Sequence, residues 1–254
     1  RSSWPPLRAC SSSLSCCGQF RCSKETTVVS YVIRRWYDIG LVLAVPAIIW
    51  AMVGDLNTVQ LILLLNFVAL LLHQFEEMRW PGGSPWILNE VFNRRDGPAD
   101  RYPLNQANCA FINIVAWGFY LVPVFFPGAV WLGLFQVLLG MVGQLIVHGI
   151  IINIKLKTVY NPGLAAVVFG HIPLGIWYLV EVYSQDSVSG RDWLFGVLTL
   201  VGFVGIVMLK VGYGLMADRN TRYPFEAWEM ARWNRLQRLT RAGIAPLPLG
   251  TGSS

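Results

Sequence analysis

Residues 57–77 read NTVQLILLLNFVALLLHQFEE, an apolar run that ends in a cluster of polar side chains. A helix of about 20 apolar residues crosses the roughly 30 Å hydrocarbon core of a bilayer. An ionisable side chain within such a segment is costly unless it has a partner, and it often marks a functional site. The run therefore predicts a transmembrane helix with a buried polar site formed by His73, Glu76 and Glu77 near one end.

The rest of the chain has the composition of a polytopic membrane protein. Of its 254 residues, 54% are hydrophobic and only 13% are charged, and the mean hydropathy is +0.48. Soluble domains carry about 25% charged residues. Five more apolar runs have a length that can span a membrane, and turn residues separate them. We predict an all-α bundle of six transmembrane helices over residues 36–54, 57–77, 107–126, 129–152, 160–182 and 193–216.

The basic residues alternate with the predicted loops. They gather before the first span and after the second, fourth and sixth: Arg34, Arg35, Arg79, Arg94, Arg95, Arg101, Lys155, Lys157, Arg219, Arg222, Arg232, Arg235, Arg238 and Arg241. By the positive-inside rule this pattern places both termini in the cytoplasm, in a protein of the plasma membrane. The net charge of +6 therefore reflects topology, and nucleic acid is excluded as a partner.

Three domains follow from these patterns. Residues 1–27 are rich in Ser and Cys, lack zinc-ligand spacing and are predicted to be a disordered tail. Residues 28–218 form the transmembrane domain, and residues 219–254 form a basic amphipathic helix with a tail. Residues 84–95 are predicted to be a short helix at the membrane interface, with Pro85 in its first turn.

The candidate site combines imidazole and carboxylate groups from several spans. On a helix, His73 shares a face with Glu76 and Glu77, three and four residues later. His148 lies at a similar depth in the fourth span by helical rise. Imidazole and carboxylate together suit zinc or iron, so we predict a divalent metal held by His73, Glu77 and His148. His171, which lies deeper, is a further candidate ligand, a hydrogen-bond donor to one of the ligands or a substrate contact.

Polar amides near these residues are predicted to orient the ligands or to contact a substrate. They are Asn66, Asn108, Asn113, Gln144 and Asn153. Two alternatives compete with a metal site. In the first, the histidines act only as hydrogen-bond partners between helices. In the second, nearby arginines, and no metal ion, compensate the two glutamates.

Part of the chain resembles a known family. The string His73-Gln74-Phe75-Glu76-Glu77, followed by Pro81-Gly82-Gly83, is similar to the signature of the HxxEE-motif family of uncharacterised multi-span membrane proteins. His148 late in a middle span and the step from Tyr160 to Gly163 are also similar, so the resemblance covers roughly residues 40–180. It implies a metal-dependent membrane enzyme without naming a reaction.

Together these features predict a metal-dependent hydrolase or transferase that acts on a lipid or other amphiphile near the cytoplasmic leaflet. One of Glu76 and Glu77 would bind the ion, and the other would act as a general base. One alternative is a proton-coupled transporter that uses the His and Glu side chains as a relay, and another is a structural membrane protein. Membrane lipids and a small amphiphilic substrate are the predicted partners; the sequence does not specify the oligomeric state.

Overall fold

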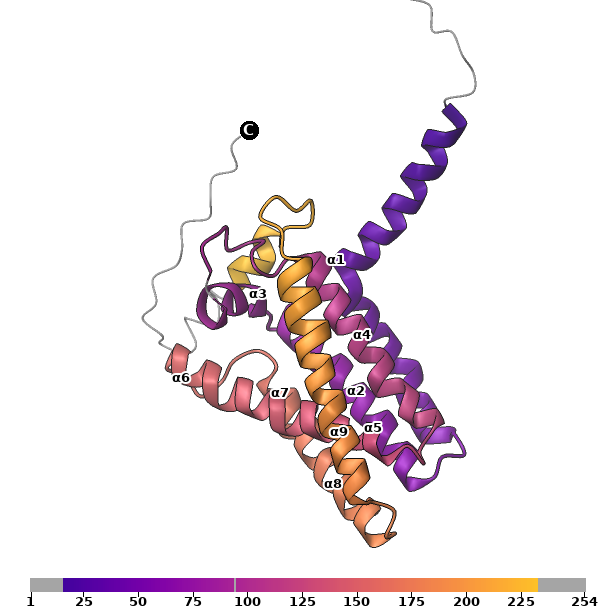
Figure 1. The fold of residues 1–254 in the computed structure, drawn as a ribbon. Coiled ribbons are helices and arrows are strands. Elements are labelled where there is room, and N and C mark those ends of the chain that lie inside the picture. Colours follow the sequence, from indigo (N-terminus) through magenta and orange to yellow (C-terminus); the bar gives the residue numbers. More distant parts are fainter. Residues whose placement is uncertain (1–15, 94, 233–254) are drawn as a thin grey trace, which may run out of the picture.

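The computed structural model describes residues 16–93 and 95–232, which are all-helical (Figure 1). Segments labelled η have the wider hydrogen-bonding pattern of a π-helix. The elements are α1 Cys16–Val53, α2 Thr58–Met78, α3 Ser84–Trp86, η1 Ile87–Phe92, α4 Gln106–Phe125, α5 Val130–Gln136, η2 Val137–Gly143, η3 Leu145–Ile152, α6 Asn153–Leu156, α7 Leu164–Ala166, η4 Val167–His171, α8 Ile172–Ser184, α9 Gly190–Gly202 and η5 Phe203–Leu215.

Six of the described helical segments are long and apolar enough to cross a membrane. They cover Val28–Val53, Thr58–Met78, Gln106–Phe125, Val130–Leu156, Leu164–Ser184 and Gly190–Leu215. The prediction of six apolar helices in an all-α bundle is therefore confirmed. The orientation of the termini and the choice of membrane stay predictions.

The ends of the chain differ in part from the predicted domains. Helix α1 already begins at Cys16, inside the segment 1–27 that we predicted to be disordered. Adding residues to an existing helix costs less free energy than nucleating a new one, which explains why the helix of the first span extends towards the N-terminus. Residues 1–15 and 233–254 lie outside the described part, so only the beginning of the predicted C-terminal helix, over residues 227–232, can be followed.

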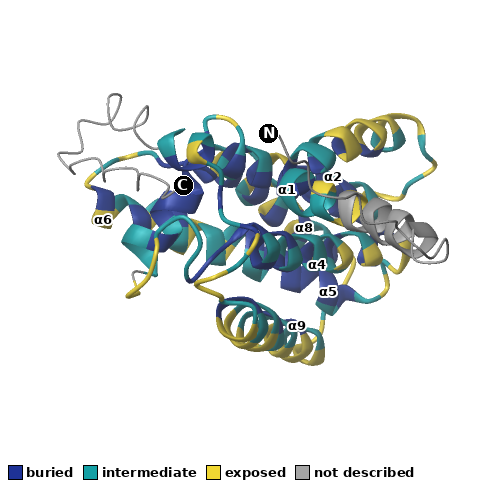
Figure 2. Cartoon of the chain, turned by 90° about the horizontal axis from the view of Figure 1, so that it is seen from above, coloured by how far each residue is buried: buried dark blue, intermediate teal, exposed yellow. Residues whose placement is uncertain are grey.

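Helix α2 is the centre of the bundle. It packs against α1, α4, α8 and the segment from α7 to η4. In its span 61% of the residues are buried, compared with 11% in the last span, which contacts the bundle mainly through α5 and α4. Figure 2 accordingly shows α9 at the edge of the bundle with many exposed residues. The helix that carries the HxxEE string is thus the most enclosed of the six.

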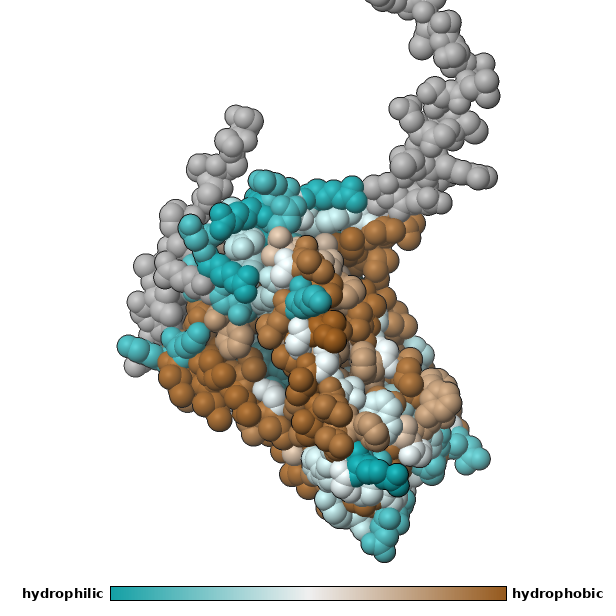
Figure 3. All heavy atoms as spheres, viewed as in Figure 1, coloured by the Kyte–Doolittle hydropathy of each residue, from teal (hydrophilic) through white to brown (hydrophobic). Residues whose placement is uncertain are grey.

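The outer surface of the bundle is apolar. Large side chains such as Phe169 and Leu215 are 82% and 76% exposed. Figure 3 shows hydrophobic residues along the sides of the helices and hydrophilic ones gathered towards the ends. Such a surface is unstable in water and fits the hydrocarbon of a bilayer.

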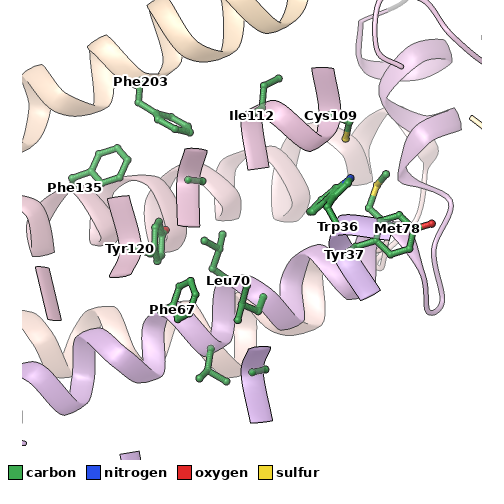
Figure 4. Packing of buried hydrophobic residues seen from close by; sticks show 14 of the residues in the cluster. Trp36, Tyr37, Phe67, Leu70, Met78, Cys109, Ile112, Tyr120, Phe135 and Phe203 are labelled. Carbon is green, nitrogen blue, oxygen red and sulfur yellow. The ribbon is translucent and has the colours of Figure 1, made fainter. Parts of the chain in front are cut away.

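Aromatic side chains fill the interior between the helices (Figure 4). Phe135 and Phe203 have ring centroids 5.6 Å apart, and Phe119 lies against both, which joins α4, α5 and η5. Trp36 and Tyr37 of α1 pack edge to face beside Met78 at the other end. These contacts hold the helices at fixed rotations, which a polar site shared between helices requires.

The predicted interfacial helix exists but is largely buried. It runs over Ser84–Phe92, and Pro85 lies in its first turn as expected. Gly83, with φ of 111°, occupies the N-cap position, and Trp86 and Ile87 are buried. The segment packs against α2 and α6. Protein therefore covers its apolar side, which we had assigned to the membrane surface.

The C-terminal segment is anchored by a buried carboxylate. Glu229 is fully enclosed and accepts hydrogen bonds from the Tyr37 hydroxyl (3.1 Å), Gln106 Nε2 (2.8 Å) and the Glu226 amide (2.6 Å). Burial raises the pKa of Glu229, and the three donors limit the rise because they favour the charged form. This residue links the segment to α1 and α4.

Replacing Glu229 by Ala should destabilise the bundle. The change leaves the Tyr37 hydroxyl and the Gln106 amide without their acceptor, at a cost of about 1–3 kcal/mol. The midpoint of thermal unfolding in detergent should fall by roughly 2–8 °C. Asp96→Ala, at an exposed loop residue, is the matched control and should leave the midpoint unchanged. An equal shift in both variants would contradict the anchoring role.

Candidate metal centre

His73 is buried near the end of α2 and has one ring nitrogen fixed. Its side chain is 2% exposed, and Nδ1 lies 2.9 Å from the carbonyl oxygen of Gly163. A carbonyl oxygen only accepts hydrogen bonds, so Nδ1 carries a proton, and in the neutral ring Nε2 is left with a lone pair. That nitrogen lies 3.6 Å from Oε2 of Glu77, one turn later on α2.

His148 repeats this arrangement from the π-helical segment η3. Its Nδ1 lies 2.6 Å from Oδ1 of Asn161. The amide nitrogen of Asn161 donates to the His148 carbonyl and to Oδ1 of Asn153, both at 2.7 Å, and this fixes which atom of the amide faces the ring. In the neutral ring, His148 Nε2 is therefore also left with a lone pair, 3.3 Å from Oε1 of Glu77.

Glu77 lies between the two imidazoles and completes a set of three ligand atoms. Each of these residues, His73, Glu77 and His148, offers one ligand atom, and the three atoms lie within 4.8 Å of one another. Ligand atoms on a tetrahedral zinc, with bonds of about 2.0–2.2 Å, are roughly 3.3–3.6 Å apart. The observed separations of 3.3 and 3.6 Å lie in this range, although they run to the two different oxygens of Glu77. The buried group of His73, Glu77 and His148 could therefore hold a metal ion.

The loop of residues 160–163 closes over this group. Gly163 has φ of +100°, a conformation that favours glycine. A Cβ atom there would lie 2.8 Å from Cε1 of both His73 and His148 and 3.0 Å from Cγ of Glu77. Only glycine lets the backbone come close enough for its carbonyl to reach His73. The sequence reasoning did not assign roles to Asn161 and Gly163; the Pro-Gly step at the start of a span was the only signal for them.

Glu76 faces this loop and has different contacts from Glu77. Oε1 accepts from the Tyr160 hydroxyl (2.7 Å) and the Ala165 amide (3.1 Å), and Oε2 accepts from the Ala166 amide (2.8 Å). The amides belong to the first turn of α7, where a helix attracts negative charge. Burial, followed by the bond to Glu76, raises the pKa of Tyr160. Glu76 therefore ties α2 to the loop that positions both histidines.

The arginine alternative is not seen in the described residues. Glu77 is within ion-pair distance of His73 and His148, and Glu76 is bound by the hydroxyl and the two amides. Arg79 instead pairs with Asp38, with Nε 3.3 Å from Oδ1. The two carboxylates at the end of α2 thus have separate partners: the imidazoles lie beside Glu77, and a helix N-terminus binds Glu76.

Two of the five predicted amides join the histidines directly or through one neighbour. Oδ1 of Asn66 lies 2.6 Å from Nδ1 of His171. Asn153 accepts from Asn161, as described above, and donates to the Gly149 carbonyl at 3.3 Å. Both were predicted to support the ligands, and these contacts fit that role.

The other three predicted amides lie outside the hydrogen bonds of the site. Asn108 caps α4 and donates to the Gly212 carbonyl at 3.1 Å, and Asn113 bridges Gln74 and Cys109. They share the depth of the histidines but serve contacts between helices. Gln144 is half-buried between the π-helical segments η2 and η3. That it shares a face with His148 stays a prediction, which assumes α-helical spacing in a stretch flanked by π-helical segments.

His171 lies deeper and outside the compact group of three. It is 1% exposed, and its ring centroid is 5.9 Å from that of His73 and 6.0 Å from that of Tyr120. Its Nε2 has no hydrogen-bond partner among the described residues. The structure thus brings the third histidine beside the candidate centre without including its nitrogen in the set of three ligand atoms.

An apolar groove of about 530 Å³ runs along α2 and the fifth span. Glu76 is its only charged lining residue. The groove is lined by Leu65, Val68, Ala69, Leu72, Glu76, Ala165, Ala166, Phe169, Gly170, Pro173, Leu174 and Trp177. One end of this groove therefore reaches the residue that fixes the loop over the candidate metal centre.

The fold and site define a helical membrane protein with a buried His–Glu–His group at the end of its central span. Residues 64–178 match the family described as "Protein of unknown function with HXXEE motif". The resemblance predicted from the sequence is thereby confirmed. No curated protein and no solved structure gives a significant match to the chain.

Removing the Glu76 carboxylate should loosen the loop. In Glu76→Ala the amides of Ala165 and Ala166 lose their acceptor, and hydrogen exchange there should become at least about tenfold faster, as a loss of about 1.4 kcal/mol implies. Glu181→Ala removes an exposed hydrogen bond to Gln185 and is the control. Unchanged exchange of residues 160–166 in Glu76→Ala, measured by mass spectrometry, would contradict the anchoring role.

Proposed function

We propose that this protein is a membrane-embedded, metal-dependent enzyme, a hydrolase or transferase, with one divalent ion held by His73, His148 and Glu77. The observation that carries the proposal is the convergence of two imidazole nitrogens and a carboxylate at separations of 3.3 and 3.6 Å in a buried site. Zinc and iron are the ions that best suit this donor set.

The hydrogen bonds around the ligands support this assignment. Metal-binding histidines almost always donate their second ring nitrogen to an oxygen, which fixes the tautomer and the ring orientation. The carbonyl oxygen of Gly163 accepts this hydrogen bond from His73, and the side-chain oxygen of Asn161 accepts it from His148. Both Nε2 atoms are thereby prepared as ligands. A cluster held only by packing would not require the same tautomer in both rings.

Each carboxylate has its own task in this proposal. Glu77 is a ligand, and its side chain is 13% exposed while those of His73 and His148 are only 2–3% exposed, so a substrate approaches from its side. Glu76, predicted as a possible base, has both oxygens engaged by three donors, and we assign it a positioning role. A bound divalent ion would act as a Lewis acid and would lower the pKa of water.

The groove supports an amphiphilic substrate. Its apolar walls lie at the depth of the hydrocarbon, and its single charged residue, Glu76, lies at the same end of α2 as the ligands. A molecule with a hydrocarbon chain and a polar head fits this gradient. The positive-inside pattern would place that end at the cytoplasmic leaflet, so we propose lipids of that leaflet or a smaller amphiphile as substrate.

The transporter alternative receives less support. In many transporters the membrane helices are interrupted at the level of the binding site. Helix α1 continues through Pro46, and Pro173 lies in the first turn of α8 directly after η4, without a break in the chain of helical residues. Both prolines were the candidates for broken helices. Within the described residues the polar groups therefore lie between continuous helices.

Metal analysis tests the proposal. Purified wild-type protein should contain about one zinc or iron per chain, and His73→Ala, His148→Ala and Glu77→Ala should each lose most of it, since removing one ligand weakens binding strongly. Asn113→Ala, at a half-buried amide outside the site, should keep the ion. A chelator should lower the unfolding midpoint of the wild type but not of the three ligand variants.

Absence of stoichiometric metal from the wild type would refute the enzyme proposal. If the ligand variants were in addition merely less stable, the structural alternative would be favoured. Uptake into proteoliposomes that depends on pH and is lost in His73→Ala would favour the transporter.

Gly163→Ala should weaken metal binding without removing any ligand. The added methyl group would lie 2.8 Å from both imidazoles, so the rings must move apart. We expect at least about a tenfold lower affinity, in the range seen when groups that orient metal ligands are changed. Gly82→Ala is the matched control, because Gly82 also has a positive φ but lies outside the site. Equal affinities for both variants in a competition assay with a chromogenic chelator would contradict this arrangement.

A further inference from the structure

A second polar cluster lies deeper in the bundle, beside the candidate metal centre. It consists of Asn66 on α2, Tyr120 on α4, Gln136 on α5 and His171 at the end of η4. All four are buried in an apolar surrounding. Among the described residues, Nε2 of His171 and Oε1 of Gln136 are fully enclosed polar atoms without a hydrogen-bond partner. A buried polar atom of this kind costs free energy unless something pairs with it.

The unpaired nitrogen of His171 is an acceptor. Nδ1 lies 2.6 Å from Oδ1 of Asn66, so the proton is on Nδ1, as in His73 and His148. Nε2 therefore has a lone pair and can bind either a metal ion or a hydrogen-bond donor. The set of ligand atoms that lie within 4.8 Å of one another comprises those of His73, Glu77 and His148 but not those of His171. A hydrogen-bond donor is thus the partner that this geometry favours.

The surroundings keep His171 next to the metal centre. Its ring meets that of His73 at an angle of 69°, with centroids 5.9 Å apart. Gly140 makes room for it, because a Cβ there would lie 2.7 Å from both His171 Nδ1 and the Tyr120 hydroxyl. Tyr120 is itself tied to α5, since its carbonyl accepts from Gln136 Nε2 at 2.8 Å. The cluster is therefore held in place beside His73, on the midplane side of the three ligands.

We propose that His171 binds the reacting molecule directly: its Nε2 accepts a hydrogen bond from an O–H or N–H group that lies between it and the ion. This rests on the proposed function and narrows the substrate class to amphiphiles whose reacting head carries a proton donor, such as a hydroxyl or an amide. Asn66 positions the ring by fixing its tautomer. A molecule without such a donor leaves Nε2 unpaired and binds less well.

Cobalt-loaded protein allows a test that does not need the natural substrate. Two small probes bind to metal ions, and the visible spectrum of cobalt reports both. Methanesulfonamide binds through a nitrogen that keeps an N–H, whereas azide carries no proton. In His171→Phe, methanesulfonamide should bind about tenfold more weakly while azide affinity changes less than about twofold, and the cobalt content should stay at the wild-type level.

A second set of variants guards against misfolding at His171. Asn66→Leu removes the acceptor that fixes the ring and should weaken methanesulfonamide binding selectively, whereas Asn66→Asp keeps an acceptor and should retain it. Asn113→Leu is the control at a half-buried amide outside the cluster.

Four results would overturn the inference. Loss of cobalt in His171→Phe would make His171 a ligand, and equal weakening of both probes would make it a structural residue. Unchanged binding of both probes would remove any direct contact. Absence of cobalt from the wild type would refute the proposed function itself, and the inference with it, so the two failures are distinguished by the metal content of the unmodified protein.

Discussion

The arrangement of this bundle depends on pairing ring nitrogens where water is excluded. Three imidazoles lie among apolar helices, and in each the Nδ1 atom faces an oxygen: the Gly163 carbonyl, the Asn161 amide or the Asn66 amide. With Nδ1 protonated, each ring keeps a lone pair on Nε2. Two of these lone pairs face Glu77, and the third has no partner in the described residues. The same tautomer in all three rings is what a site for a cation and a proton donor requires.

The adjacent glutamates of the HxxEE string follow from this requirement. Residues i and i+4 share a helix face, so His73 and Glu77 can meet one ion from the same helix. Glu76 is rotated by about 100° and points to the neighbouring span, where it binds the first amides of α7. The loop held by Glu76 supplies the oxygens for His73 and, through Asn161, for His148. The motif therefore combines two ligands with the residue that positions their supports.

Much of this could be predicted from the sequence, because hydropathy and helical periodicity are local signals. They identified the six helices, the shared face of His73 and Glu77 and the common depth of His148. Rotation of one helix against another is not a local signal, so depth alone could not tell that Asn108 and Asn113 bond to partners other than the histidines. The face shared by Gln144 and His148 stays a prediction, since it assumes α-helical spacing and the fourth span is π-helical on either side of Gln144. The roles of Asn161 and Gly163 depend on a loop that crosses between spans, and no periodic pattern describes such a loop.

The position of Glu76 also connects the two halves of the proposed site. Its carboxylate binds the loop over the ligands, and the same side chain lies at the end of the apolar groove. The groove and the ligand set are on neighbouring faces of α2, so they can be shaped separately by residues such as Leu72 on one face and His73 on the other. A hydrocarbon chain would need only apolar walls, since it gains little from specific contacts, whereas the reacting group needs fixed donors and acceptors. Specificity in such a protein would therefore reside in the small polar cluster around His171, and the groove would determine mainly how long a chain is accepted.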